Sequence, residues 1–251
     1  MAQPHSAFPV RFDSGRHFRA KIGYVLLATE QTIEDDVYRL RPQGVGVHFA
    51  RAPIPDSITN ASLLAQVDHL AAAAARLLPD NSLDVICYAC TSGSLVIGEQ
   101  QVFAQLQKGA PGAEPTSLIT GVIRALRALD VRRIAVATPY LDEINQREAA
   151  YLGQAGFEVI NIEGLKLERD SDMVRVAPDS IFEFARSVDR ANAEALFVSC
   201  GALRTLDVIE DLERALGKPA LCSNQAMIWD TLRRAGIADS IQGFGSLLRD
   251  H

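Results

Sequence analysis

The stretch Val85-Ile86-Cys87-Tyr88-Ala89-Cys90-Thr91-Ser92-Gly93 joins a short apolar strand to a run of small residues. A second stretch, Leu196-Phe197-Val198-Ser199-Cys200-Gly201, has the same pattern, and in both a cysteine closes the apolar run. In an open α/β sheet, the positions just beyond the carboxyl ends of the strands hold the ligand-binding groups. The sequence therefore predicts that Cys90 and Cys200 face a ligand.

The repeat extends beyond the two cysteines. Residues 21–29 and residues 133–138 each begin with a basic residue, continue as an apolar strand and end in threonine. The offset between these two strand starts nearly equals the offset between the cysteines. This agreement predicts two similar lobes that face each other across a cleft, with one thiol from each lobe.

Strand-like and helix-like patterns alternate along the whole chain. The strand-like runs are 22–27, 45–49, 83–88, 134–138, 157–162, 195–199 and 219–222, and the helix-like runs are 33–39, 62–78, 99–106, 116–129, 140–155, 180–191, 205–217 and 224–235. Sustained alternation predicts an α/β fold of mainly parallel sheets flanked by helices, with the active site in the cleft between two pseudo-symmetric lobes.

The predicted organisation has three parts. A flexible N-terminal segment covers residues 1–19, the first lobe covers 20–128 plus 226–251, and the second lobe covers 129–225. The first lobe is discontinuous because the apolar stretch 241–248 is expected to pack back onto it.

Composition narrows the class of protein. The 251 residues are 48% hydrophobic, enough for two modest cores, and the net charge is −6 without a long Lys/Arg run, which argues against a nucleic-acid partner. The sequence has neither an apolar leader nor an apolar run long enough to span a membrane, so we expect a cytoplasmic protein without a membrane partner. There the four cysteines would be reduced. A homo-oligomer is left open.

A catalytic cysteine needs neighbouring groups that stabilise its thiolate. A free cysteine has a pKa of about 8.5 and is only a few per cent thiolate at neutral pH. Thr91 and Ser92 after Cys90, and Gly201 after Cys200, are small enough to let backbone N–H donors approach a thiolate, a carboxylate or an enolate oxygen.

Other uses of the cysteines fit less well. Cys87 and Cys90 form a Cys-x-x-Cys pair, but Cys87 lies inside an apolar run and no second ligand pair completes a zinc site. A Cys-His hydrolase would need a distant partner such as His48 or His69. No nucleotide-binding motif is present. We therefore expect neither a metal nor a cofactor.

The loops after the first strand of each lobe should face the cysteines. Glu30 follows the first of these strands, whereas Tyr140 and Asn145 follow the second. The Tyr140 hydroxyl and the Asn145 amide are candidates for binding carboxylate oxygens, although Tyr140 fits a core aromatic with an exposed tip equally well.

With these segments assembled, the chain resembles the aspartate/glutamate racemase superfamily, in the branch of maleate cis-trans isomerases, arylmalonate decarboxylases and racemase-like proteins of ectoine utilisation. The likeness covers residues 21–248. It is densest at Ala125-Leu126-Arg127-Ala128-Leu129-Asp130-Val131-Arg132-Arg133, Tyr140-Leu141-Asp142-Glu143-Ile144-Asn145, Ser199-Cys200-Gly201 with Thr205-Leu206-Asp207, and Gly243-Phe244-Gly245.

The resemblance implies a cofactor-independent enzyme that acts on a small carboxylate. Cys200 resembles the family's second-lobe acid and Cys90 its first-lobe base or nucleophile. Thr91, Ser92, Tyr140 and Gly201 match positions that bind a substrate carboxylate and its enediolate in the decarboxylases. Those decarboxylases have glycine in place of Cys90, so two thiols favour an isomerase or racemase.

One departure bears on the substrate. Maleate isomerases have asparagine where this chain has Glu30, and an extra carboxylate would repel a dianion but pair with an ammonium group. Glu30 therefore favours an amino-acid-like substrate if it faces the site. The alternatives are an arylmalonate-type decarboxylase, a maleate isomerase that works by covalent addition of Cys90, and a carboxylate-binding module without catalysis.

Overall fold

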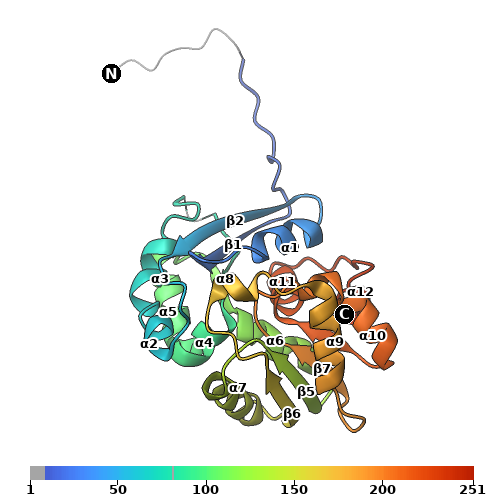
Figure 1. The fold of residues 1–251 in the computed structure, drawn as a ribbon. Coiled ribbons are helices and arrows are strands. Elements are labelled where there is room, and N and C mark those ends of the chain that lie inside the picture. The colour runs from blue at the N-terminus through green and yellow to red at the C-terminus, as the bar shows by residue number, and fades with distance from the viewer. Residues whose placement is uncertain (1–8, 81) are drawn as a thin grey trace.

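Two four-stranded parallel sheets form the centre of the molecule (Figure 1). The computed structural model describes residues 9–80 and 82–251. The strand order is β2-β1-β3-β4 in the first sheet and β6-β5-β7-β8 in the second. Since the second order repeats the first with every strand number raised by four, the predicted internal repeat and the predicted two-lobed α/β fold are both confirmed.

The strands are β1 (Ala20–Leu27), β2 (Val45–Ala52), β3 (Val85–Tyr88), β4 (Glu114–Ser117), β5 (Arg133–Thr138), β6 (Glu158–Gly164), β7 (Ala195–Val198) and β8 (Ala220–Cys222). The helices of the first half are α1 (Ile33–Leu40), α2 (Asn60–Leu64), α3 (Val67–Ala74), α4 (Thr91–Ile97), α5 (Glu99–Gly109) and α6 (Leu118–Ala128). Those that follow are α7 (Asp142–Gln154), α8 (Asp170–Met173), α9 (Pro178–Val188), the 3₁₀ turn η1 (Thr205–Asp207), α10 (Ile209–Leu216), α11 (Ser223–Arg234) and α12 (Ser246–Asp250).

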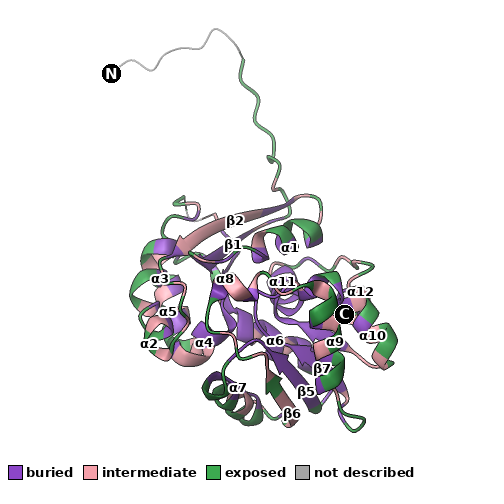
Figure 2. Cartoon of the chain, viewed as in Figure 1, coloured by how far each residue is buried: buried purple, intermediate pink, exposed green. Residues whose placement is uncertain are grey.

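The central strands are apolar because both faces of each sheet are covered. Every residue of β3 and of β7 is buried, as expected for parallel strands between two layers of helices. Figure 2 shows this burial at the centre, with exposed residues on the outer faces of helices such as α7 and α10.

Several predicted helices begin, break or end differently in the structure. The run 62–78 was expected to be one helix, but it breaks into α2 and α3 at residues 65–66 and ends at Ala74. At the break, Gln66 turns inward and its side-chain amide donates to the Pro53 carbonyl at 2.6 Å, while its own N–H bonds to Leu63 three residues back. The predicted helix 140–155 begins only at Asp142, so Tyr140 lies in a loop.

Strand β4 was not predicted. Its sequence, Glu-Pro-Thr-Ser, is polar and contains proline, which cannot donate a ladder hydrogen bond. The strand lies at the edge of its sheet, where proline is tolerated. The edge position therefore allows a strand where the local sequence does not favour one.

Helices α6 and α11 pack against each other between the two sheets (Figure 1). The helices meet at Gly121, where an added Cβ would lie 3.0 Å from the Cα of Met227. No side chain larger than hydrogen fits this contact without a shift, so the two backbones touch.

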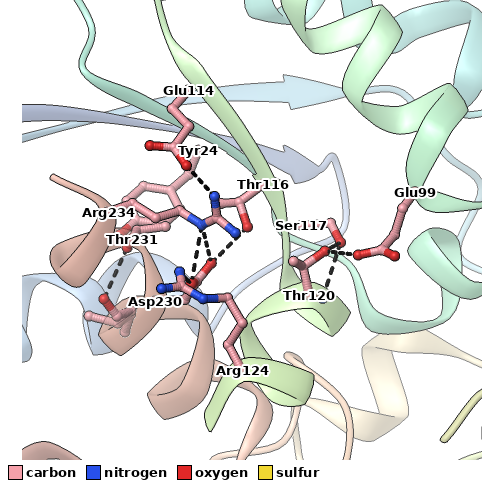
Figure 3. Close-up of polar contacts among 11 residues, drawn as sticks. Tyr24, Glu99, Glu114, Thr116, Ser117, Thr120, Arg124, Asp230, Thr231 and Arg234 are labelled. Atoms are coloured by element: carbon pink, nitrogen blue, oxygen red, sulfur yellow. Dashed lines mark hydrogen bonds and ion pairs between the residues drawn. The ribbon is translucent and has the colours of Figure 1, made fainter. Parts of the chain in front are cut away.

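Buried polar contacts hold α11 to the first sheet (Figure 3). Asp230, which is fully buried, accepts from Thr116 of β4 at 2.7 Å and pairs with Arg124 of α6 and Arg234 of α11. Nearby, the hydroxyl groups of Tyr24 and Thr231 lie 2.7 Å apart. The helix that follows β8 is thus fastened to the opposite lobe.

The C-terminal stretch contacts both halves of the molecule. The Arg39 guanidinium of α1 lies over the Phe244 ring, while the N–H groups of Gly245 and Ser246 donate to Glu210 and Glu213 of α10. Residues 1–8 of the predicted N-terminal segment lie outside the described residues. No helix among the described residues is long and apolar enough to cross a membrane.

Candidate active site

A cavity opens where the carboxyl ends of the central strands of both sheets meet. In the first sheet β2 lies on one side of β1 and β3 on the other, and in the second sheet β6 and β7 flank β5 in the same way. The direction in which the chain crosses each sheet therefore reverses between β1 and β3 and between β5 and β7, and ligands bind at such switch points. The cavity is narrow, and its empty volume of about 330 Å³ includes the open space at its mouth. It is lined by Leu27, Glu30, Ile58, Ala89, Cys90, Thr91, Ser92, Tyr140, Asp170, Met173, Cys200, Gly201 and Ala202.

The cavity brings together the predicted site residues with one exception. Both thiols and the predicted contacts Glu30, Thr91, Ser92, Tyr140 and Gly201 line it. Asn145 does not. Its amide oxygen instead accepts a hydrogen bond from Thr138 at 2.6 Å beneath the loop that carries Tyr140.

Cys90 lies at the start of helix α4 in extended backbone. The Gly93 N–H donates to its sulfur at 3.2 Å, and the Ser92 hydroxyl lies 3.7 Å from it. A Cβ on Gly93 would lie 2.3 Å from the Tyr88 hydroxyl, so only glycine allows this approach. Burial raises the pKa of Cys90 to about 11, and the contacts from Gly93 and Ser92 act to lower it.

Cys200 lies in a different backbone conformation. Its φ of +94° is in the region that disfavours side chains, and strain of this kind costs about 1–3 kcal/mol. Burial raises the pKa of Cys200 above that of Cys90, and the Asp170 carboxylate adds to the rise. Hydrogen bonding from Tyr140 and from the Ala202 backbone opposes it.

Ser223 connects the two cysteine turns. It is the first residue of α11, and its hydroxyl accepts the Cys200 N–H at 2.9 Å while lying 3.1 Å from the Thr91 hydroxyl. Ser223 was not predicted from the sequence, because it follows the short strand β8 and resembles an ordinary helix N-terminus. A search for serines that follow repeat strands would have identified it.

Asp170 lines the cavity and was also not predicted from the sequence. It is buried, with 4% of its surface exposed, and its carboxylate accepts from the Thr29 hydroxyl at 2.5 Å. In the sequence it lies in a polar stretch that reads as a surface loop. The loop nevertheless follows β6, the counterpart of β2, and an antiparallel bridge between Ser57 and Arg169 joins the two loops beside the cavity.

The arrangement supports acid–base or nucleophilic chemistry at carbon. Two thiols from repeat-related turns share one cavity with the hydroxyl groups of Thr91, Ser92 and Tyr140. Hydroxyl and backbone donors suit a developing enolate or carboxylate oxygen. Burial raises the pKa values of both thiols, so a reaction through a thiolate needs a ligand or a neighbouring group that favours the charged sulfur.

Comparison with known proteins connects this cavity to two kinds of enzyme. A family model described as arylmalonate decarboxylase matches residues 48–248. An arylmalonate decarboxylase from Bordetella bronchiseptica is 34% identical over 186 residues, which cover 72% of this chain and 75% of that protein. A maleate isomerase from Nocardia farcinica is 27% identical over 245 residues, 91% of this chain and 95% of that protein.

A solved structure extends the likeness to the whole fold. A mutant of the Nocardia farcinica maleate cis-trans isomerase, with a covalently bound succinylcysteine intermediate, matches with a TM-score of 0.84 at 25% identity, covering 92% of this chain and 99% of that one. These similarities confirm the predicted resemblance and the predicted fold class.

Proposed function

The chain belongs to the arylmalonate decarboxylase family, and from that premise we propose that it is a cofactor-independent isomerase or racemase whose thiols, Cys90 and Cys200, act on opposite faces of a small carboxylic acid. The observation that carries the proposal is the single cavity that both thiols line. The relatives are isomerases and decarboxylases, and they indicate an isomerase or a related enzyme rather than a carboxylate-binding module.

In the racemase form, the Cys90 thiolate removes the α-proton from one face of the substrate. The electron pair of the C–H bond moves into the carboxylate to form an enediolate, which accepts hydrogen bonds from Thr91, Ser92, Tyr140 and the Gly201 backbone. The Cys200 thiol then delivers its proton to the opposite face, and the two thiols exchange protons with solvent before the next turnover. Donors of this kind typically contribute about 100-fold or more each in rate.

A second form is favoured by the relative with the succinylcysteine intermediate. Here the Cys90 thiolate adds to the double bond of an ene-dicarboxylate, a C–S bond forms, and the electron pair of the double bond moves onto the neighbouring carboxylate. Rotation about the new single bond and elimination of the thiolate release the other isomer. A decarboxylase is the third form, and the thiol at position 90, where the family's decarboxylases have glycine, counts against it.

Incubation of the enzyme with candidate acids in D₂O separates these forms. Racemisation predicts incorporation of deuterium at the α-carbon without release of CO₂. Covalent isomerisation predicts a mass increase at Cys90 equal to the acid. Release of CO₂ would assign the decarboxylase instead, and absence of all three signals across the panel would refute an enzyme of this type.

Several finer features remain part of the proposal. We propose action in the cytoplasm on a small carboxylate, without a nucleic-acid or membrane partner, and leave a homo-oligomer open. The lobe boundaries also remain proposed, at 20–128 plus 226–251 for the first lobe and 129–225 for the second. The fastening of α11 to β4 supports assigning the last helices to the first lobe.

A further inference from the structure

Two carboxylates from opposite lobes face the same cavity as the thiols. Glu30 follows β1, Asp170 begins α8, and both line the cavity with only 5% and 4% of their surfaces exposed. Neither takes part in an ion pair with any residue in the described ranges 9–80 and 82–251. Buried carboxylates are normally paired, because an uncompensated charge is costly away from water.

The protein holds one oxygen of each carboxylate and leaves the other free. Glu30 Oε1 accepts the backbone N–H groups of residues 31, 32 and 33 at 2.9, 2.5 and 2.9 Å, where α1 begins. Asp170 Oδ2 accepts the Thr29 hydroxyl. Oε2 of Glu30 and Oδ1 of Asp170 accept no hydrogen bond from the part of the chain that the structure describes, yet neither is sealed from solvent-accessible space. Each carboxylate is thus fixed in place with an oxygen available to a ligand.

The same pair opposes ionisation of the thiols. Asp170 raises the pKa of both Cys90 and Cys200, and Glu30 raises the pKa of Cys200 further. Burial also raises the pKa values of Glu30 and Asp170 themselves. A dicarboxylate ligand would raise them further, whereas a cation between the carboxylates and the sulfurs would favour the charged form of both acids. The charge of the cavity therefore suits a ligand that brings its own positive group.

We propose that Glu30 and Asp170 form a subsite for a protonated nitrogen, and that the substrate is a small α-amino acid whose ammonium group lies beside the carbon that the thiols deprotonate. This inference rests on the proposed function and names its substrate class. The carboxylate of the same zwitterion faces the hydroxyl groups of Thr91, Ser92 and Tyr140. The acidic pair and the hydroxyl donors thus orient the two charged ends, and the α-carbon lies between the sulfurs.

The test compares molecules that differ only at nitrogen. Aspartate and alanine are matched with succinate and propionate, which lack the nitrogen, and with N-acetylaspartate, which keeps the N–H but loses the positive charge. Binding is measured as the rise in Tm of the purified protein, and turnover as α-proton exchange in D₂O. We expect at least one of the two amino acids to raise the Tm and to exchange, and its nitrogen-free partner to bind at least about 30-fold more weakly.

Isosteric variants assign the effect to the two carboxylates. Glu30→Gln and Asp170→Asn keep the oxygen that the protein holds, and each should lower kcat/KM for the amino acid at least about 30-fold. The double variant should gain affinity for succinate. The matched controls are Glu34→Gln on α1 and Asp172→Asn on α8, which remove acidic side chains already paired with Arg51 and Arg175 and should leave both readouts unchanged.

The outcomes separate this inference from the proposed function. If the amino acids bind through the acidic pair but no α-proton exchanges, the subsite stands and the racemase fails. If maleate is isomerised while neither amino acid raises the Tm, the isomerase stands and the subsite is overturned. Equal binding of N-acetylaspartate and aspartate, or amide variants that bind aspartate normally, would also overturn it.

Discussion

The two cysteine turns occupy the same position in their sheets but have different surroundings. Cys90 follows β3 in extended backbone, and the first turn of α4 supplies an N–H to its sulfur. Cys200 follows β7 at positive φ with no helix beginning at the next residue, and its own N–H is held by Ser223. Duplication has thus preserved where each thiol lies, while the residues that follow each strand have diverged.

This difference indicates a division of labour. Cys90 has the lower pKa of the pair, at about 11, because Gly93 and Ser92 stabilise its thiolate. Burial raises the pKa of Cys200 further, and Asp170 and Glu30 add to the rise, so its thiol stays protonated to higher pH. We therefore expect Cys90 to act as base or nucleophile and Cys200 as proton donor.

Removing either sulfur should have the largest effect. Cys90→Ala and Cys200→Ala should each lower racemisation at least about 1,000-fold, because each face loses its proton carrier. The comparison predicts a further distinction: Cys200→Ala should still exchange the α-proton of one enantiomer into D₂O, since Cys90 remains.

Chiral chromatography and NMR measure these two quantities separately. Cys87→Ala, which removes a buried cysteine outside the cavity, is the control for thiol loss as such. Near-normal racemisation by either cavity variant would refute the two-thiol scheme.

Tyr140→Phe tests the donor on the Cys200 side. The change removes one hydroxyl from the cavity and should lower kcat about 100-fold, as for other oxyanion donors. The control is Tyr151→Phe on α7, a half-buried tyrosine that does not line the cavity. If steady-state kinetics give equal kcat values for the two variants, Tyr140 has no role in stabilising the intermediate.

The alkylation rates of Cys90 and Cys200, measured at increasing pH, should distinguish the two thiols. Because both pKa values are raised, the thiolate fraction at pH 7 is lower than in a free cysteine, and the rate should rise about tenfold per pH unit. Cys90 should react at least about tenfold faster than Cys200 up to pH 10. Peptide mass spectrometry after brief iodoacetamide exposure gives both rates, and faster labelling of Cys200 would reverse the assignment of roles.

Ser223→Ala should have the smallest effect. It removes the hydroxyl that joins the two turns, which should cost about 1 kcal/mol in the free energy of unfolding and about tenfold in kcat, because the Cys200 backbone loses its anchor. Urea denaturation and kinetics measure the two quantities. Ser187→Ala, at an exposed serine of α9, is the control, and an unchanged kcat would show that the turns do not depend on this link.

The central strands and the paired cysteines were predictable because they depend on local apolar runs and on the repeat. The features that escaped prediction depend on tertiary context. Strand β4 is polar and forms because β3 offers it an edge. Asp170 looks like a surface residue until the loops after β2 and β6 meet. Asn145 has an amide suited to a carboxylate, but its oxygen accepts a hydrogen bond from Thr138 and the residue does not line the cavity.

The contact at Gly121 limits how closely the two helices between the sheets can approach each other. Main-chain atoms of α6 and α11 touch there, so these two helices cannot move closer together. Substitutions in the cavity wall can change which ligand groups the cavity accepts. A larger side chain at Gly121 would instead push the two helices apart.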